Sequence, residues 1–436
     1  MDKIIGVLGL GKSGIAVSNL AVKLGYKVFA SDNEEHKING LDKKVVIELG
    51  KHSDKILNSK IIIKSPGIST NISILKKAVN RKIKVMSELA FSLKNSKYKK
   101  IIAVTGTNGK TTTTDLISKI IKYSRQNSIV VGNIGCPLAS MALKTTKKTY
   151  IIMELSSYQL EDTCDFRPNV SVLLNITPDH LKRHKTMKAY IRAKENVFIN
   201  QKKRDFLVIN YDDKICRKIA IKSKAKVIFF SKQFLQNGIF CNNGKIVVKN
   251  GKKCMEISPK INIVGMHNME NILAAVATTY VIGIKLDIIE KIISEYEGME
   301  HRIKFVRRLN GVDYYNDSKS TNIDSTKAAI ESFNGNILLI LGGRDKGMSY
   351  TPLKKLIKQK VKAVFLIGEA ANKIKEDLLN LSIFFNSDTV ENALNQISKV
   401  AVSGDIVLFS PACASFDQFN NFEERGEFFK KLVVKL

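Results

Sequence analysis

The chain of 436 residues has no tryptophan, only 7 prolines and only 6 cysteines. The cysteines are Cys136, Cys164, Cys216, Cys241, Cys254 and Cys413. They lie far apart and no two form a C-x-x-C pair, which excludes a zinc knuckle and a disulfide framework. The sequence also lacks an apolar leader and any run of about 18 apolar residues. We therefore expect reduced thiols, a cytoplasmic location and no membrane span.

Acidic residues are scarce, because 40 Asp and Glu stand against 71 Lys and Arg, giving a net charge of +31. Such an excess by itself suggests a nucleic-acid or anionic-membrane partner. The lysines, however, are scattered through almost every segment and form no long block of like charge. A basic nucleic-acid-binding ATPase would also need a basic face interleaved with aromatic residues, which the sequence does not show. We expect no nucleic-acid partner and no membrane partner.

Apolar runs of strand length alternate with amphipathic runs of helix length almost from end to end. This alternation is typical of an α/β protein in which helices cover parallel sheets. A polar linker at residues 95–100 and a change of pattern near residue 298 predict three stacked domains, covering residues 1–96, 97–298 and 299–436. Between Ile239 and Ile263, two Asn-Gly pairs punctuate short alternating runs and predict a β-ribbon or small antiparallel sheet.

The loop Gly106-Thr107-Asn108-Gly109-Lys110-Thr111-Thr112 lies between an apolar strand, residues 101–105, and a helix expected at residues 115–122. In that position backbone N–H groups and the helix N-terminus hold phosphate oxygens, the lysine meets the transferred phosphate and Thr111 meets Mg²⁺. A glycine-rich turn without a ligand is the alternative, but such a turn has no use for Gly-Lys-Thr-Thr.

A second glycine-rich turn, Gly9-x-Gly11-x-x-Gly14, follows the first strand, and Asp32 lies eighteen positions after its last glycine. This pattern is similar to a dinucleotide fingerprint and suits a nucleotide diphosphate at the helix N-terminus. Two alternatives stay open. The glycines can serve only close strand–helix packing, or the turn can belong to a nicotinamide dehydrogenase, which would leave residues 106–112 unexplained.

Glu154 and His180 follow later strands of the central domain, at the sheet edge where open α/β sheets place their ligands. A carboxylate and an imidazole near a triphosphate suit a divalent metal ion. A solvated or capping role is the alternative for each residue alone, and the neighbouring phosphate loop favours the metal.

In the last domain, residues 316–322 and 410–419 each follow a strand and are rich in small and hydroxyl side chains. Such segments suit an anion or carboxylate, while ordinary N-capping explains them equally well.

These segments form an ordered series together with several others. The series comprises Ser65-Pro-Gly-Ile68, residues 106–112, Gly132-Asn-Ile-Gly135, residues 154–160, His267-Asn-Met-Glu-Asn271, His301-Arg302, residues 316–322 and residues 410–419. In order and spacing it resembles the Mur ligase family, over all three expected domains. The resemblance implies Rossmann-like N-terminal and C-terminal domains around a central domain similar to P-loop ATPases.

The activity implied by the resemblance is ATP-dependent amide bond formation in the cytoplasmic synthesis of peptidoglycan precursors. Within the family the motifs match the branch that adds D-glutamate to UDP-N-acetylmuramoyl-L-alanine through an acyl phosphate, releasing ADP and phosphate. Other amino-acid-adding Mur ligases and folylpolyglutamate synthases share the central loop, Glu154, His180 and Lys194 and remain the near alternatives. The N-terminal glycine-rich unit and residues 410–419 favour the D-glutamate branch. We expect a monomer.

The resemblance also implies a role for each matched residue. The catalytic residues are Lys110, Glu154, His180 and Lys194, the last matching a carbamylated lysine. Two Mg²⁺ ions would be held by Thr111, Glu154, His180 and Lys194. ATP would be bound by Gly106, Thr107, Asn108, Gly109, Lys110, Thr111, Thr112, Asn271, Arg302 and Asp317, with Asn271 and Asp317 toward adenosine. The UDP-sugar would be bound by Ser13, Asp32, Ser65, Asn133, Gln159 and His180. D-Glutamate would be bound by Lys319, Thr321, Lys346, Ser415 and Phe416.

Overall fold

The computed structural model describes residues 4–35, 37–133, 135–161, 163, 165–379, 381 and 383–436. Ile134 and Cys164, named in the sequence arguments, lie outside these residues. The described chain contains three sheets, one in each of three α/β domains. By contact density it divides into two compact units, residues 1–259 with 270–292 and residues 260–269 with 293–436. We call these the first and the second unit and describe each by itself.

The N-terminal sheet of the first unit has five parallel strands. Their spatial order is β3 (Val46–Glu48), β2 (Lys27–Ser31), β1 (Ile4–Leu8), β4 (Ile61–Lys64) and β5 (Lys84–Ser87). The helices are α1 (Lys12–Lys23), α2 (Ser73–Asn80) and α3 (Glu88–Lys94), with a 3₁₀ turn at Asp54–Asn58. Buried Ile5, Val7 and Ile63 of the strands pack with Val17 and Leu20 of α1 in one apolar cluster. That packing fixes the glycine-rich turn between β1 and α1.

The central sheet, also in the first unit, has nine strands. Their spatial order is β14 (Lys253–Ile257), β13 (Lys245–Asn250), β12 (Gly238–Asn242), β11 (Lys226–Ser231), β10 (Phe206–Asn210), β9 (Val170–Leu173), β6 (Lys100–Thr105), β8 (Tyr150–Glu154) and β7 (Ser128–Gly132). All neighbours from β7 to β12 are parallel, and β12, β13 and β14 are antiparallel. The antiparallel strands predicted between Ile239 and Ile263 are present. Rather than standing apart, they extend the central sheet, because β12 pairs with β11.

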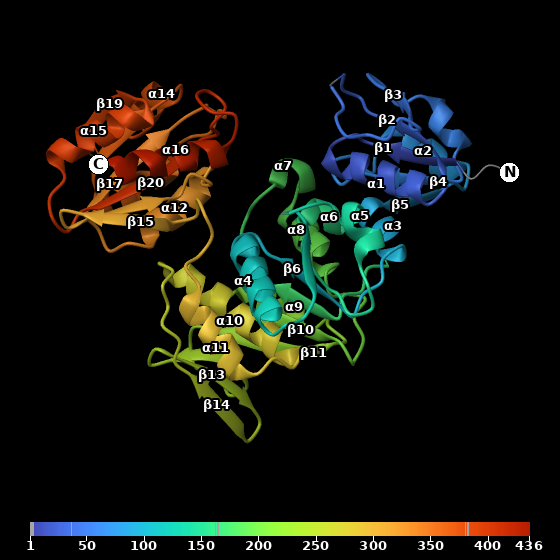
Figure 1. Ribbon diagram of the computed structural model, residues 1–436, viewed down its shortest axis with the longest axis horizontal. Helices are drawn as coiled ribbons and strands as arrows, with labels where there is room; N and C mark the ends of the chain where they lie inside the picture. The colour runs from blue at the N-terminus through green and yellow to red at the C-terminus, as the bar shows by residue number, and fades with distance from the viewer. Residues whose placement is uncertain are drawn as a thin grey trace. The chain divides into compact units, whose positions relative to one another are not determined.

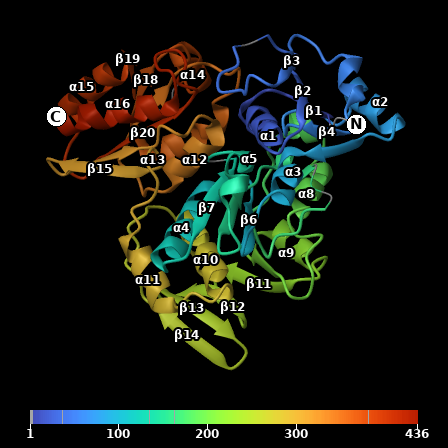
Figure 2. The same ribbon diagram turned by 45° about the vertical axis from the view of Figure 1, so that its right-hand side comes forward.

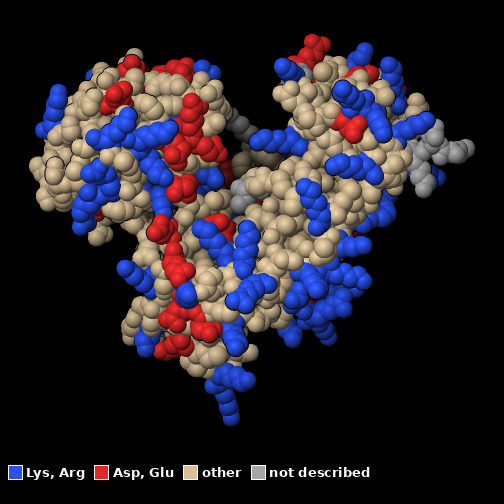
Figure 3. Space-filling model, viewed as in Figure 1, with Lys and Arg blue, Asp and Glu red and all other residues tan. Residues whose placement is uncertain are grey.

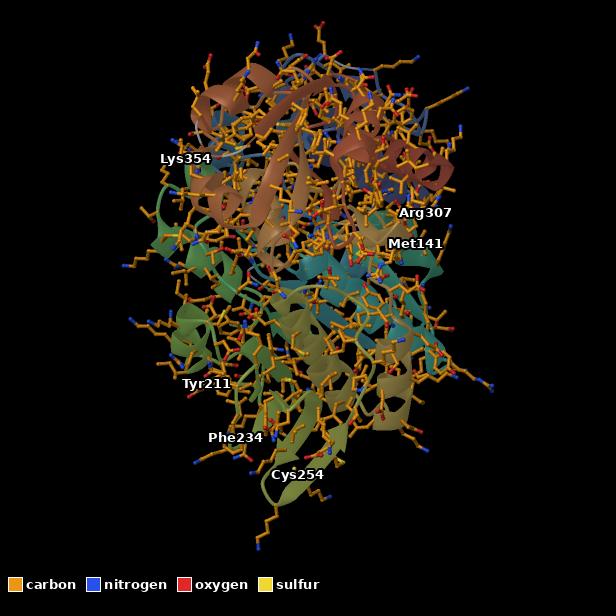
Figure 4. All side chains as sticks on the ribbon, turned by 90° about the vertical axis from the view of Figure 1, so that its left-hand side faces the viewer. Met141, Tyr211, Phe234, Cys254, Arg307 and Lys354 are labelled. Atoms are coloured by element: carbon orange, nitrogen blue, oxygen red, sulfur yellow. The ribbon has the colours of Figure 1, made fainter. Side chains whose placement is uncertain are left out.

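Helices flank the central sheet and complete the first unit (Figures 1 and 2). They are α4 (Lys110–Tyr123), α5 (Leu138–Met141), α6 (Ser157–Glu161), α7 (Leu181–His184), α8 (Met187–Glu195), α9 (Lys214–Ala220), α10 (Met266–Val281) and α11 (Leu286–Glu295), with a 3₁₀ turn at Ala142–Lys144. The first residues of α10, 266–269, and the last of α11, 293–295, are counted with the second unit. At the far edge, β14 carries an exposed thiol, Cys254 (Figure 4). Each of the five cysteines that the structure describes is free of a disulfide.

The sheet of the second unit has six strands, of which only the edge strand β15 runs antiparallel to its neighbour. Their spatial order is β15 (Lys304–Leu309), β16 (Val312–Asn316), β20 (Ile406–Ala412), β17 (Ile337–Gly342), β18 (Val361–Ile367) and β19 (Ile383–Asp388). The helices are α12 (Ile323–Glu331), α13 (Lys354–Lys360), α14 (Ala371–Asp377), α15 (Val390–Val400) and α16 (Phe422–Lys435), with a 3₁₀ turn at Thr351–Leu353.

Strand β17 shows why this sheet is apolar on both faces. Its residues Ile337, Leu339 and Leu341 belong to the cluster formed with α12, α13 and α14. Leu338 and Ile340 belong to the cluster formed with α15 and α16 on the opposite face. Because side chains alternate along a strand, a strand covered by helices on both faces must be apolar at every position. The continuous apolar run follows from this arrangement.

Two general expectations bear on the surface. No helix among the described residues is long and apolar enough to cross a membrane. On the face shown in Figure 3, Lys and Arg side chains occur on both units, some in small groups, among Asp and Glu side chains and uncharged surface. The absence of a nucleic-acid partner stays a prediction.

Candidate active site

The loop between β6 and α4 has the geometry of a phosphate-binding turn. Gly109, the N-cap residue of α4, has a φ of 84°, and a Cβ there would lie 2.1 Å from Oδ1 of Asn271. Both constraints require glycine. Gly109 has no side chain that could cap α4, and the first turn of the helix contains no acidic residue, so the start of this helix suits an anion. The helix begins at Lys110, five residues earlier than predicted, and therefore directly at the loop.

Lys110 closes this loop on itself. Its ammonium donates to the carbonyl oxygens of Gly106 at 2.9 Å and Thr107 at 2.8 Å. Asn175, which follows β9, holds the loop through two hydrogen bonds. Its side-chain oxygen accepts from the N–H of Asn108 at 2.8 Å, and its carbonyl oxygen accepts from the N–H of Thr107. The lysine is thus already held at the turn where phosphate oxygens would lie.

Lys194 on α8 contacts the same loop. Its side chain is buried, with 1% of its surface exposed, and its ammonium donates to the carbonyl of Gly106 at 2.8 Å. Burial, and next the charge of Lys110, hold the pKa of Lys194 well below its usual range. An amine in this setting is neutral far more readily than a solvated lysine.

Glu154, the last residue of β8, presents an unsatisfied carboxylate oxygen. The residue is 1% exposed, and its Oε1 accepts from the side-chain amide of Asn133 at 2.8 Å. Its Oε2 is buried and has no hydrogen-bond partner within the described part of the chain. Since an unpaired buried carboxylate oxygen is costly, this atom fits a cation.

His180 immediately precedes α7 and has a left-handed backbone, with φ of 54°. Its Nδ1 is 3.1 Å from the hydroxyl of Tyr158, and Nε2 of its half-exposed ring is 3.4 Å from a carboxylate oxygen of Asp179. The Tyr158 contact orients the ring, which suits a ligand that coordinates through Nε2.

His184 was not among the predicted residues, although it lies in the middle of this region. It is buried, its Nδ1 is 3.0 Å from Glu161, and its Nε2 is 2.9 Å from the hydroxyl of Ser157. Its ring stacks on Tyr158, and burial lowers its pKa. No local pattern marks it, because His180 lies outside α7 with a left-handed backbone and the partners of His184, Ser157 and Glu161, come from a separate segment of the chain.

The five residues predicted at the UDP-sugar site besides His180 line one cavity of about 550 Å³. They are Ser13, Asp32, Ser65, Asn133 and Gln159. They come from segments separated by up to 146 positions, since Ser13 and Gln159 lie at the extremes. Two of them also shape the first glycine turn, because Asp32 accepts from the N–H of Leu10 at 2.6 Å and Ser65 donates to the carbonyl of Gly9 at 3.0 Å.

Asp317 and Arg302, predicted to bind ATP, belong to the second unit. Asp317 accepts from the hydroxyls of Ser320 and Ser410 and from the N–H of Ile303. Its complete burial raises its pKa to about 6. Arg302 has a buried Nε that lacks a partner among the described residues. Asn271, the third such residue, lies in the first unit against Gly109, and its Oδ1 accepts from the hydroxyl of Thr113 at 3.3 Å.

The residues predicted to bind D-glutamate lie on loops at one edge of the second unit's sheet. Lys346 donates to the carbonyl of Thr321 at 3.0 Å, which joins two of these loops. The Lys319 ammonium lies 5.4 Å from the centre of the Phe422 ring. Ser415 is buried, whereas 62% of the Phe416 surface is exposed. Phe422 and the buried Arg425 contact these loops but were not predicted, because their place on a helix says nothing about which loops that helix meets.

Family models match three parts of the chain in order. They are the Mur ligase MurD-like N-terminal domain at residues 3–87, the Mur ligase middle domain at residues 104–279 and the Mur ligase glutamate ligase domain at residues 301–413. The chain belongs to the Mur ligase family. It is therefore an ATP-dependent ligase of this class.

Particular relatives are similar over almost the full length. The UDP-N-acetylmuramoylalanine--D-glutamate ligase of Elusimicrobium minutum is 43% identical over 443 residues, with 99% of this chain and 97% of that protein covered. The enzyme of the same name from Clostridioides difficile is 40% identical, with 99% and 98% covered. Among solved structures, the MurF ligase of Thermotoga maritima in complex with ADP matches with a TM-score of 0.64 at 18% identity, covering 100% of this chain and 96% of that one. The UDP-N-acetylmuramate-alanine ligase MurC of the same organism matches with a TM-score of 0.60 at 19% identity and covers 100% of both chains. At these identities the two structures show the fold alone.

Proposed function

We propose that this chain joins D-glutamate to UDP-N-acetylmuramoyl-L-alanine with cleavage of ATP to ADP and phosphate, in the synthesis of peptidoglycan precursors. The observation that carries the proposal is the 43% identity, over 99% of the chain, to the UDP-N-acetylmuramoylalanine--D-glutamate ligase of Elusimicrobium minutum. Three features of the site add support, namely a phosphate loop, an unsatisfied buried carboxylate and a buried lysine, all near the end of β6.

The first chemical step is transfer of the γ-phosphoryl group of ATP to the L-alanyl carboxylate. A carboxylate oxygen attacks phosphorus, the bond to the β-phosphate oxygen breaks, and ADP leaves. Lys110 and the N–H groups at the start of α4 offset the charge on the transferring group. Positioning and charge stabilisation are what a protein contributes to phosphoryl transfer, and both are present at this loop.

Metal ions belong to the same step. Thr111 and Glu154 would hold one Mg²⁺, and His180 and Lys194 would contribute to a second. The unpartnered Oε2 of Glu154 supports this assignment, because a divalent cation satisfies a carboxylate oxygen that no protein donor reaches. When bound, Mg²⁺ supplies Lewis-acid neutralisation of the phosphate oxygens.

Lys194 would reach a metal only after carbamylation. Its neutral amine attacks CO₂, one N–H proton is released, and the product carries a carboxylate in place of the cation. The burial of Lys194 and the nearby charge of Lys110 favour the neutral amine that this reaction needs. One N–H remains to donate to the carbonyl of Gly106.

The second step is attack of the D-glutamate amine on the acyl phosphate, with loss of phosphate. D-Glutamate carries two carboxylates, and each needs cationic, hydroxyl or N–H donors. Lys319, Thr321, Lys346 and the segment Ser415-Phe416 supply these groups from three loops. Fixing both carboxylates directs the amine of one enantiomer to the acyl carbon and the other away from it.

The UDP-sugar would occupy the cavity that Ser13, Asp32, Ser65, Asn133 and Gln159 line, with His180 beside it. The contact between Asn133 and Glu154 supports a substrate site that borders the metal site. We further propose a cytoplasmic monomer without nucleic-acid or membrane partners, with domains at residues 1–96, 97–298 and 299–436.

Phosphate release tests this function. The purified chain, ATP, Mg²⁺ and UDP-N-acetylmuramoyl-L-alanine are combined with D-glutamate, L-glutamate, L-lysine or meso-diaminopimelate. We expect release with D-glutamate only. Equal or faster release with another amino acid would place the chain in a different branch of the family, and no amino-acid-dependent release would refute the function.

A further inference from the structure

Arg425 occupies an unusual position for a cation. It lies in the first turns of α16, yet the N-terminal end of a helix favours negative charge. Only 1% of its surface is exposed, and it is among the largest fully buried side chains of the chain. Burial lowers the pKa of its guanidinium to about 10. Such a residue persists only where its hydrogen bonds are well satisfied.

Backbone carbonyls, rather than a carboxylate, satisfy Arg425. One terminal nitrogen donates to the carbonyls of Ser318 at 2.8 Å and Cys413 at 3.1 Å, and the other donates to the carbonyl of Ala414 at 3.2 Å. Its Nε donates to the hydroxyl of Ser318 at 3.1 Å. No acidic group within the described residues forms a salt bridge with it. Its task in the fold is therefore to hold backbone, not to pair charge.

The carbonyls belong to two separate loops. We call residues 317–322 the β16 loop and residues 413–421 the β20 loop. Strands β16 and β20 are parallel neighbours, so both loops leave the same edge of the sheet. Ser318 stands between Asp317 and Lys319, and Ala414 precedes Ser415. One guanidinium thus binds the backbone beside proposed substrate residues on both loops.

The loop that contains Lys346 is held through the same point. The carbonyl of Ala414, which accepts from Arg425, also accepts from the N–H of Arg344 at 2.9 Å. The hydroxyl of Ser318 in turn donates to the carbonyl of Phe422, the first residue of α16, at 2.8 Å. Arg425 therefore lies at the junction of all three loops that carry the proposed D-glutamate residues.

Only arginine has the geometry for this junction. Its five donors lie in one plane with fixed directions, whereas the lysine ammonium is a single point on a flexible stem. A lysine at position 425 would keep the positive charge but could not reach carbonyls of both loops with the same spread of donors. The substitution R425K therefore keeps the positive charge but removes the planar set of donors.

We propose that Arg425 is a positioning residue for the amino-acid substrate, fixing the β16 and β20 loops relative to one another so that both carboxylates of D-glutamate meet their partners. The inference rests on the proposed function. Arg425 is proposed to act through the loops rather than on the substrate, since each of its three guanidinium nitrogens donates to the backbone or the hydroxyl of loop residues.

The test compares steady-state kinetics of the full-length wild type and R425K for each substrate in turn. We expect KM for D-glutamate to rise about tenfold or more, as for other supporting partners of a binding site, with KM for the UDP-sugar within about twofold of the wild type. The UDP-sugar cavity lies in the first unit and shares no residue with the loops. A uniform loss across the substrates would indicate general damage and overturn the proposal.

Arg307 provides the matched control. It also donates to backbone carbonyls of α16, at Val433 and Val434, but at the opposite end of the helix (Figure 4). We expect R307K to leave KM for D-glutamate unchanged. An equal rise in R307K would show that any loosening of α16 has the same effect, which would overturn a specific role for Arg425.

S318A is the second variant, for use if R425K does not fold. It removes the hydroxyl that accepts from Nε and donates to the carbonyl of Phe422, while the three carbonyl contacts of Arg425 remain. We therefore expect a smaller rise in KM for D-glutamate, of about threefold. An unchanged KM for D-glutamate in a folded R425K, or in S318A where R425K does not fold, would overturn the proposal. A wild type without D-glutamate-dependent phosphate release would instead refute the proposed function itself.

Discussion

Two glycine-rich turns in the first unit join a parallel strand to a helix, and the same residue type serves different needs in each. In the first turn a Cβ at Gly14 would lie 1.8 Å from the carbonyl oxygen of Gly9, while one at Gly11 would have nothing within 4 Å. In the second turn Gly109 is required by its φ of 84° and by Asn271 beside it. Gly14 is thus a packing residue, Gly11 borders open space, and Gly109 shapes the loop.

The lysines of the two turns differ as well. Lys12 is exposed at the start of α1 and lines the cavity proposed for the UDP-sugar. Lys110 is held by two carbonyls of its own loop, above the buried Lys194. The first turn therefore resembles a binding surface, whereas the second holds charge in a fixed place, as catalysis by charge stabilisation requires. Variants in the two turns should separate these roles.

The largest contrast is expected between K110A and K12A. K110A should lower kcat by about 100-fold or more, because it removes a preorganised charge from the transferring phosphate. K12A should change kcat little and raise KM for the UDP-sugar. Phosphate release at varied substrate concentrations measures both, and circular dichroism confirms folding. Near-normal kcat in a folded K110A would show that residues 106–112 are not the ATP site.

Replacement of Lys194 tests the buried lysine that donates to the carbonyl of Gly106 in the second turn. K194A should lose about 10- to 100-fold in activity, as expected for loss of a metal-supporting group. A small carboxylate such as acetate should restore part of the activity by supplying the missing oxygens. K188A, on the same helix α8 but exposed, is the control. Full activity of K194A in CO₂-depleted buffer would remove the carbamate from the mechanism.

Gly14 and Gly11 separate packing from binding in the first turn. G14A should lower the free energy of unfolding by about 3 kcal/mol, because the added methyl group overlaps backbone that cannot move aside cheaply. G11A has an extended N-cap backbone and open space, so its stability should lie within about 0.5 kcal/mol of the wild type. Denaturant titrations measure both values. A stable G14A would mean that the turn can shift as a whole.

Much of this architecture could be predicted from local pattern. Apolar runs located strands in all three sheets, and glycine-rich turns located two junctions of a strand with a helix, because periodicity and turn chemistry are local properties. The start of α4 was missed since its first turns are a run of threonines, which have low helix propensity but are buried here. The attachment of β12 to β11 was missed because the edge at which a strand pairs is a long-range property.

The residues of the candidate site also fall into two groups, those that a local sequence pattern marks and those that depend on long-range contacts. Lys110, Glu154 and Lys194 belong to recognisable segments, and the structure brings Lys110 and Lys194 to one loop. His184 and Arg425 acquire their importance from partners far away in the sequence, such as Ser157 and Cys413. No local pattern marks an arginine whose acceptors are carbonyls of other loops. Their roles follow from the fold alone.

The smallest effect is expected at Ser65, where binding and packing meet in one hydroxyl. This buried group donates to the carbonyl of Gly9, and it would also lie 3.0 Å from a Cβ at Gly14. S65A should therefore cost about 1 kcal/mol of unfolding free energy, the usual contribution of one buried hydrogen bond. We expect S69A, at a half-buried serine of the same segment whose hydroxyl accepts from the N–H of Asn71 at a long 3.3 Å, to cost less than about 0.5 kcal/mol.

If the Ser65 hydroxyl acts by shaping the turn, S65A must change both the free energy of unfolding and KM for the UDP-sugar. A turn displaced from its wild-type position should also raise KM for the UDP-sugar by a few fold, since Gly9, Gly11 and Ser65 all line that cavity. Unchanged stability with a raised KM would assign the hydroxyl to the substrate rather than to the turn. The first glycine turn would then bind the substrate directly, as the phosphate loop is proposed to do. The remaining difference between the two turns would be the different settings of Lys12 and Lys110.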